Sequence, residues 1–208
     1  MLRKDRVQFL QSNMKYPTTE MGRNLLIAHV SFLVHPLCII TSHLESSQER
    51  LNQLRKVWKQ IKEAPEDHTV IFGGDTNLRD WEVVHDTKAR GLPYGISEVW
   101  EMLGELEKSK YTWDTSINVN KEIPHSIRLR FDRLFLRAAA EGAQLWPESM
   151  TLIGLEKLKC DYSSAITSLR HQKSSVSMID FNCYGLHMII QLNESQCFIN
   201  KSLLINEI

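Results

Sequence analysis

The chain has 208 residues, and its 25 Lys and Arg residues balance 25 Asp and Glu residues, so the formal net charge is zero. Its length fits roughly 100–200 residues per domain, that is, one domain or slightly more. The 42% hydrophobic content excludes wholesale disorder. Neutrality excludes a protein that holds nucleic acid through a broadly basic surface, although it leaves room for a local basic cleft. No apolar run approaches the roughly 18 residues of a membrane span, so no membrane partner is expected.

The cysteines and the chain start indicate the cellular environment. The four cysteines form no C-x-x-C pair, which argues against a zinc ribbon or a thioredoxin-like site. The first residues are charged but lack the apolar segment of a secretory signal. We therefore expect a reducing interior compartment.

Apolar runs in the first part of the chain predict strands. Residues 24–33 and 37–41 predict the two arms of a hairpin, with a break at His35-Pro36. Residues 69–72 predict a buried strand that opens into a loop after Gly73-Gly74.

The segment between these strands predicts an amphipathic helix. Ser46 and Glu49 have the spacing of a capping box, which predicts the helix start, and Ala64-Pro65 predicts its end. The charged residues between positions 50 and 62 are interpreted as a solvated face. Apolar residues at helical spacing predict the buried face: Leu51, Leu54, Trp58 and Ile61.

Shorter elements are expected in the middle of the chain. Residues 81–87 and 98–103 predict short helices. Residues 128–137 alternate between apolar and charged, which predicts one strand with a bulge, and residues 143–152 predict another strand. Strands that alternate with helices indicate an α/β (α+β) class.

The character of the chain changes after Cys160. Residues 163–177 are rich in Ser and show little periodicity. We therefore divide the chain into a folded unit at residues 1–160 and a divergent, poorly ordered tail at residues 161–208.

Polar residues with chemical potential follow the strand at 69–72. Asp75 can accept a proton from water, Asn77 offers donors and an acceptor to a phosphate, and Arg79 can pair with a phosphodiester. The alternative is an Asx-rich turn that only caps the next helix. The segment alone does not decide between the two interpretations.

Three further segments offer candidates with structural alternatives. His43 and Glu45 can share one face after a strand, or they form a polar strand end. Trp113 can stack on a base, although a loop Trp is more often peripheral core. Asp132 can support a catalytic group, whereas Asp132 and Arg133 can equally form structural ion pairs.

The strings SHLES, VIFGGDTNLRD, YTWDT and LRFDR, in this order and spacing, resemble the endonuclease/exonuclease/phosphatase (DNase I-like) family. The resemblance covers roughly residues 1–160. It implies a four-layer sandwich, with two packed sheets flanked by helices. It also implies Mg²⁺- or Mn²⁺-dependent cleavage of phosphoester bonds by water.

The match is closest to family members that repair DNA. Such members release a tyrosine that a trapped topoisomerase leaves on a 5′ DNA end. The resemblance therefore implies two partners, the DNA 5′ end with its tyrosyl adduct and the trapped topoisomerase peptide, and a location in the nucleus and also the cytoplasm.

The resemblance also implies residue roles. Asp75 would position or deprotonate the water, and Asn77 would hold the scissile phosphate. Asp132 would support them. The positions that match substrate-contacting segments are His43, Leu44, Glu45, Ser46, Ser47, Gln48, Leu78, Arg79, Trp113 and Phe131.

Two family motifs are missing. The Glu that binds the metal does not precede Asn24, and a Ser-Asp-His string does not follow Cys160. We therefore expect a chain truncated at both ends, with an intron-derived tail, no assigned metal ligand, and weak or absent catalysis. The alternative to an enzyme is a DNA-end-binding protein without chemistry, or an unstable truncated form.

Overall fold

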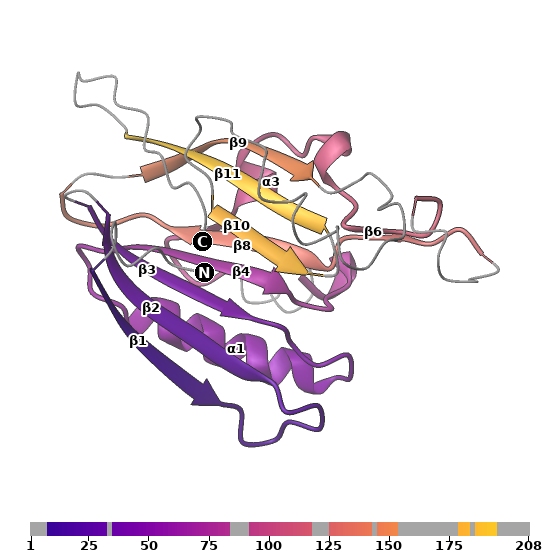
Figure 1. Cartoon of the computed structure of the whole chain (residues 1–208), viewed down its shortest axis with the longest axis horizontal. Helices are drawn as coiled ribbons and strands as arrows, with labels where there is room; N and C mark the ends of the chain where they lie inside the picture. Colours follow the sequence, from indigo (N-terminus) through magenta and orange to yellow (C-terminus); the bar gives the residue numbers. More distant parts are fainter. Residues whose placement is uncertain are drawn as a thin grey trace, which may run out of the picture.

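Two packed β-sheets, with a helix outside the larger one, form the described part of a computed structural model of the chain (Figure 1). The structure describes residues 8–32, 35–83, 92–117, 125–142, 145–153, 179–183 and 186–194. No helix in these ranges is both long and apolar enough to cross a membrane.

The larger sheet has six strands in the order β1-β2-β3-β4-β8-β5. Strands β3 and β4 are parallel, and the other neighbours are antiparallel. The bounds are β1 (Gln8–Lys15), β2 (Asn24–Phe32), β3 (His35–Ser42), β4 (Thr69–Asp75), β5 (Ile96–Glu98) and β8 (Asp132–Arg137). The predicted β2–β3 hairpin and the buried strand β4 are confirmed, but His35-Pro36 is not the predicted break, because both residues begin β3 and pair with β2. Strand β1 was not predicted.

The second sheet has three antiparallel strands in the order β10-β11-β9. Their bounds are β9 (Leu145–Ile153), β10 (Ile179–Cys183) and β11 (Leu186–Glu194). Two of these strands come from the region interpreted as a tail. The division of the chain near residue 160 stays a prediction.

The segment at 128–137 is not the single bulged strand that its alternation predicted. It forms β7 (Arg128–Leu129), which pairs with β6 (Trp113–Asp114), and then β8, which pairs with β4. The chain leaves one sheet and enters another at Arg130-Phe131, and this change places Phe131 outside both ladders.

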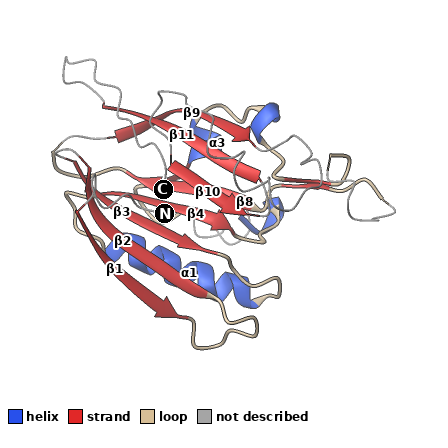
Figure 2. Ribbon diagram, in the orientation of Figure 1, coloured by secondary structure: helices blue, strands red, loops and turns tan. Residues whose placement is uncertain are grey.

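The main helix, α1 (Glu49–Glu63), lies along one face of the larger sheet (Figure 2). The predicted capping box is wrong: Gln48 occupies the N-cap and makes no side-chain capping bond. The interpretation of a wholly solvated charged face is also wrong, because Arg50 is 7% exposed. Two short helices follow, α3 (Val99–Met102) and η1 (Glu107–Ser109). Residues 80–83 are helical, and 84–87 of the helix predicted there lie outside the described residues.

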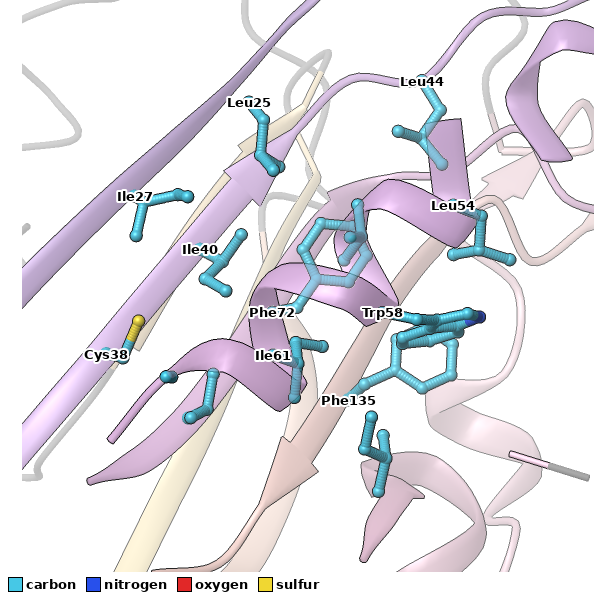
Figure 3. Close-up of a cluster of buried hydrophobic side chains, with 14 of the residues drawn as sticks. Leu25, Ile27, Cys38, Ile40, Leu44, Leu54, Trp58, Ile61, Phe72 and Phe135 are labelled. Carbon is cyan, nitrogen blue, oxygen red and sulfur yellow. The ribbon is translucent and has the colours of Figure 1, made fainter. Parts of the chain in front are cut away.

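An apolar core fills the space between α1 and the sheet (Figure 3). Trp58 on α1 meets Phe135 edge-on, with ring centroids 4.8 Å apart, and Phe72 stacks beside Phe135 at 6.1 Å. The predicted stripe of α1 supplies Leu54, Trp58 and Ile61 to this core, as expected.

A second apolar core lies on the opposite face of the same sheet, against β9. Alternation along β4 sends Phe72 to the helix side and Ile71 to the other side. The two cores confirm the two packed sheets with a helix outside.

Candidate active site

The ends of β3 and β4 bring His43 and Asp75 together. Because the two strands are parallel neighbours, the segments that follow them leave the sheet at the same edge. The Leu44 amide donates to the Asp75 carbonyl at 2.8 Å, and His43 Nε2 lies 3.2 Å from Asp75 Oδ2. The side chain of Asn77 closes the group by donating to the Leu44 carbonyl at 2.9 Å.

This edge depends on a glycine. A Cβ atom on Gly74 would lie 2.0 Å from the Ser42 carbonyl oxygen, so no larger residue fits without moving the backbone. Two residues later, Asn77 adopts the left-handed region at φ 52°, and its amide donates to Asp75 Oδ1 at 3.0 Å. The segment is therefore an Asx turn, and the same turn orients the residues proposed for chemistry.

Asp132 faces Asp75 across the β4–β8 ladder. Burial, together with the charge of Asp75, raises the pKa of Asp132 to about 7. Burial lowers the pKa of His43, although the neighbouring Asp75 acts in the opposite direction. Near neutral pH the Asp132 carboxyl can therefore either hold or release a proton beside Asp75. We call Asp75, Asp132 and His43 the acidic edge.

A cationic and aromatic wall lies beside these acids. The Arg79 guanidinium carbon lies 4.7 Å from the Phe131 ring centroid, and the Trp113 ring is 6.5 Å from Phe131 at an angle of 48°. Thr76 links the wall to the acidic edge, because its amide and hydroxyl donate to the Phe131 carbonyl at 2.8 and 2.7 Å. The structure thus brings together Arg79, Phe131 and Trp113, three of the residues predicted to contact the substrate.

The other predicted substrate-contacting residues divide by exposure. Leu44 and Leu78 are 0% and 1% exposed, so their side chains belong to the core. Ser46 and Gln48 are exposed and Ser47 is partly buried, just before α1. The roles proposed for these residues stay predictions.

Glu45 is 1% exposed and faces the turn between β1 and β2. Its Oε1 accepts from the Thr19 hydroxyl at 2.6 Å and from the amides of Glu20 and Met21 at 3.0 Å each. Burial acts to raise the pKa of Glu45, but these hydrogen bonds lower it overall. This carboxylate anchors the turn.

Sequence reasoning missed Thr112. Its hydroxyl oxygen accepts from the Phe131 amide at 3.1 Å and from the Asp132 amide at 3.0 Å. Thr112 therefore holds the point where the chain passes from the wall to the acidic edge. Its position beside Trp113 in the YTWDT string was the available signal.

Sequence reasoning also missed a buried ionic cluster behind the wall. Arg133 pairs with Glu98 at 3.0 Å and with Asp80 at 2.5 Å, and Arg130 pairs with the same two acids. Burial raises the pKa of Glu98, although both arginines oppose this shift. Arg133 thus makes structural ion pairs, whereas its neighbour Asp132 lies on the other face of β8.

The donor set for a divalent metal is incomplete in the described residues. Asp75 and Asp132 supply two adjacent carboxylates, but nowhere in the described ranges do three or more His, Cys, Asp or Glu side chains gather closely enough to hold a metal ion. We derive no chemical step through a metal from these residues.

Curated relatives match the chain closely over its larger part. Tyrosyl-DNA phosphodiesterase 2 of Danio rerio is 56% identical over 77% of this chain, and the Homo sapiens protein is 52% identical over the same share. The chain spans 44% and 45% of the lengths of these two relatives. No family model matches the chain.

Solved structures agree with this match. Danio rerio TDP2 complexed with single-strand DNA product has a TM-score of 0.71 and 54% identity, covering 76% of this chain and 64% of that one. A humanized Danio rerio TDP2 has a TM-score of 0.72 and 43% identity, covering 92% of this chain and 70% of that one.

A more distant structure supports the fold alone. An endonuclease/exonuclease/phosphatase family protein from Bacteroides thetaiotaomicron is 12% identical, with a TM-score of 0.56, over 91% of this chain and 66% of that chain. The fold and the relatives lead to the same assignment: the chain belongs to the tyrosyl-DNA phosphodiesterase 2 family, within the endonuclease/exonuclease/phosphatase fold.

Proposed function

We propose that this chain is part of a DNA-repair phosphodiesterase that hydrolyses the bond between a 5′ DNA phosphate and a tyrosine of a trapped topoisomerase. The single observation that carries the proposal is the placement of the acidic edge directly beside the cationic and aromatic wall. Asp75, Asp132 and His43 form the edge, and Arg79, Phe131 and Trp113 form the wall. A relative has been crystallised with single-strand DNA product, which supports a DNA end as the ligand.

Each part of the site has a defined task in this proposal. Asp75 orients and deprotonates the attacking water, with His43 holding the carboxylate in place. Asn77 donates to the phosphate and stabilises the charge that develops on its oxygens. Arg79 pairs with phosphate oxygens, and the rings of Phe131 and Trp113 stack on the terminal nucleotide.

A divalent ion, Mg²⁺ or Mn²⁺, is proposed for the whole protein on the strength of the family. It would supply charge neutralisation at the phosphate. The adjacent Asp75 and Asp132 carboxylates are the described groups that could contribute to its binding. Since these two carboxylates are an incomplete set of metal ligands, we propose that catalysis by this chain is weak. On the strength of the family, we also propose that the whole protein acts in the nucleus and in the cytoplasm.

The proposal is tested by release of tyrosine from a 5′-phosphotyrosyl oligonucleotide in Mg²⁺. We expect slow release that Asp75→Asn lowers by about 100-fold or more, because the water loses its base and its orientation. The exposed Glu63→Gln on α1 is the matched control and should leave the rate unchanged. Release at the same rate from Asp75→Asn would contradict the assignment of Asp75.

A second candidate is a DNA-end-binding protein without chemistry. The incomplete donor set favours it, because the wall is present in the described residues while a full metal site is not. It predicts that the chain and its Asp75→Asn variant bind a 5′-phosphorylated strand equally and that neither releases tyrosine. Measurable release by the unmodified chain would exclude it.

A further inference from the structure

A buried ion pair joins α1 to the helical segment at residues 80–83 that follows β4. Arg50 is 7% exposed and Glu82 is 1% exposed. Arg50 Nε donates to Glu82 Oε2 at 3.1 Å and Nη2 donates to Oε1 at 2.5 Å, so the guanidinium and the carboxylate meet in a two-bond fork. Burying both charges costs desolvation energy that the attraction often only offsets, so stability alone is a weak explanation for the pair.

Both partners of the pair also hold backbone groups of the proposed binding segments. Glu82 Oε2 accepts the Arg79 amide at 2.8 Å. Arg50 Nη1 donates to the carbonyls of Ser46 and Ser47 at 2.7 Å each. The two ions therefore tie the segment before α1 to the residue that forms the cationic part of the wall.

The Arg79 side chain is not part of this tie. Its guanidinium lies over Phe131, while its backbone is held by Glu82 on one side. On the other side, the adjacent Asp80 is held by Arg133 at 2.5 Å. The position of the Arg79 backbone, and so the direction of its side chain, is fixed from both sides.

We propose that Arg50 and Glu82 are positioning residues that hold Arg79 and the Ser46–Ser47 backbone in one arrangement for binding the 5′ phosphate of a DNA strand. The proposal rests on the proposed function for its ligand, although the tie between the two segments does not. The pair acts through Arg79 and touches neither the phosphate nor the attacking water.

A double-mutant cycle tests the link to Arg79. The probe is a 5′-phosphorylated single-stranded oligonucleotide, and its dissociation constant is measured for the unmodified chain, Glu82→Gln, Arg79→Ala and the double variant. Glu82→Gln keeps the shape of the side chain but replaces one carboxylate oxygen with an NH₂ group, which cannot accept from the Arg50 guanidinium or the Arg79 amide. We expect Glu82→Gln to weaken binding about fivefold in the unmodified background and not at all with Arg79→Ala present, since residues that act as a unit are non-additive.

The control for this cycle is Glu63→Gln, the same substitution on the exposed side of α1, where Glu63 pairs with Lys59. It should change the dissociation constant in neither background. Equal losses from Glu82→Gln with and without Arg79 would overturn the proposal, because they would show a general structural effect. Unchanged binding in Glu82→Gln would overturn it as well.

Amide hydrogen exchange tests the tie without any ligand. We expect Glu82→Gln to speed exchange at the Arg79 amide and, through Arg50, at the first turn of α1, while β4 amides stay protected. Arg50→Lys should have the same effect on Arg79. If the chain binds no oligonucleotide but these amides respond together, the proposed function fails and the tie stands. If exchange at Arg79 does not respond to Arg50→Lys, the positioning proposal fails.

Discussion

Helix α1 contributes to two buried regions of opposite chemistry. Its middle packs Trp58 against Phe72 and Phe135, whereas its first turn places Arg50 in a buried pair with Glu82. The apolar region is held by contact area without directional bonds. The polar region is held by a few bonds between segments 32 residues apart. The apolar middle therefore packs α1 onto the sheet, whereas the polar end ties the backbone of Ser46 and Ser47 to the Arg79 amide.

Of the variants considered, Phe72→Ala in the apolar region is expected to lower the free energy of unfolding most. Phe72 is fully buried and stacks on Phe135. Removing its ring leaves a cavity, and we expect the free energy of unfolding to fall by about 4 kcal/mol. Urea denaturation followed by circular dichroism measures this. A loss below about 1 kcal/mol would mean that the described core is not what holds the chain together.

Arg133→Met tests the polar region behind the wall. The side chain of Arg133 is 0% exposed, and its loss leaves the buried Glu98 with a single arginine partner. We expect a loss of about 3 kcal/mol, because an incompletely paired buried charge is costly. The exposed pair of Lys59 and Glu63 offers the contrast: Lys59→Met should change stability by less than about 0.5 kcal/mol. Equal effects of the two variants in denaturant titrations would remove the distinction between buried and surface pairs.

Asp132→Asn tests the acidic edge through pH. The pKa of Asp132 is raised from 3.8 to about 7, so between these values the folded chain keeps a proton that the unfolded chain has lost. Its contribution to stability therefore falls as the pH rises through this window. Relative to the unmodified chain, Asp132→Asn should gain on the order of 2 kcal/mol between pH 4 and pH 8, allowing for partial solvent contact. A constant difference between the two unfolding curves would contradict the raised pKa.

The parts of the molecule that the sequence predicted are those with a periodic signal. Strands β2, β3 and β4 and the buried stripe of α1 follow from apolar spacing. The ordered motifs identified the family and led to the grouping of Arg79, Phe131 and Trp113. Each of these signals is contained in a short stretch of chain.

The features that the sequence did not predict depend on distant partners. Arg50 has the pattern of a solvated helix residue, and only contact with Glu82 makes it buried. The helix begins two residues later than the capping-box spacing indicated, with Gln48 at the N-cap, and Arg50 donates to the carbonyls of Ser46 and Ser47 before it. Thr112 has no signal of its own beyond its neighbours in YTWDT. The split of the 128–137 segment likewise depends on its pairing with β6 and β4.

The most direct test of a DNA-end site is the difference in affinity between a 5′-phosphorylated and a 5′-hydroxyl single strand, measured for the unmodified chain, Trp113→Ala and Trp146→Ala. Trp146 is 41% exposed on β9 and serves as the matched tryptophan control. We predict tighter binding of the phosphorylated strand. We also predict that Trp113→Ala weakens that binding by about tenfold, the value of one stacked base, and that Trp146→Ala leaves it unchanged. Equal affinity for the two strands, or equal effects of the two tryptophan variants, would contradict the account.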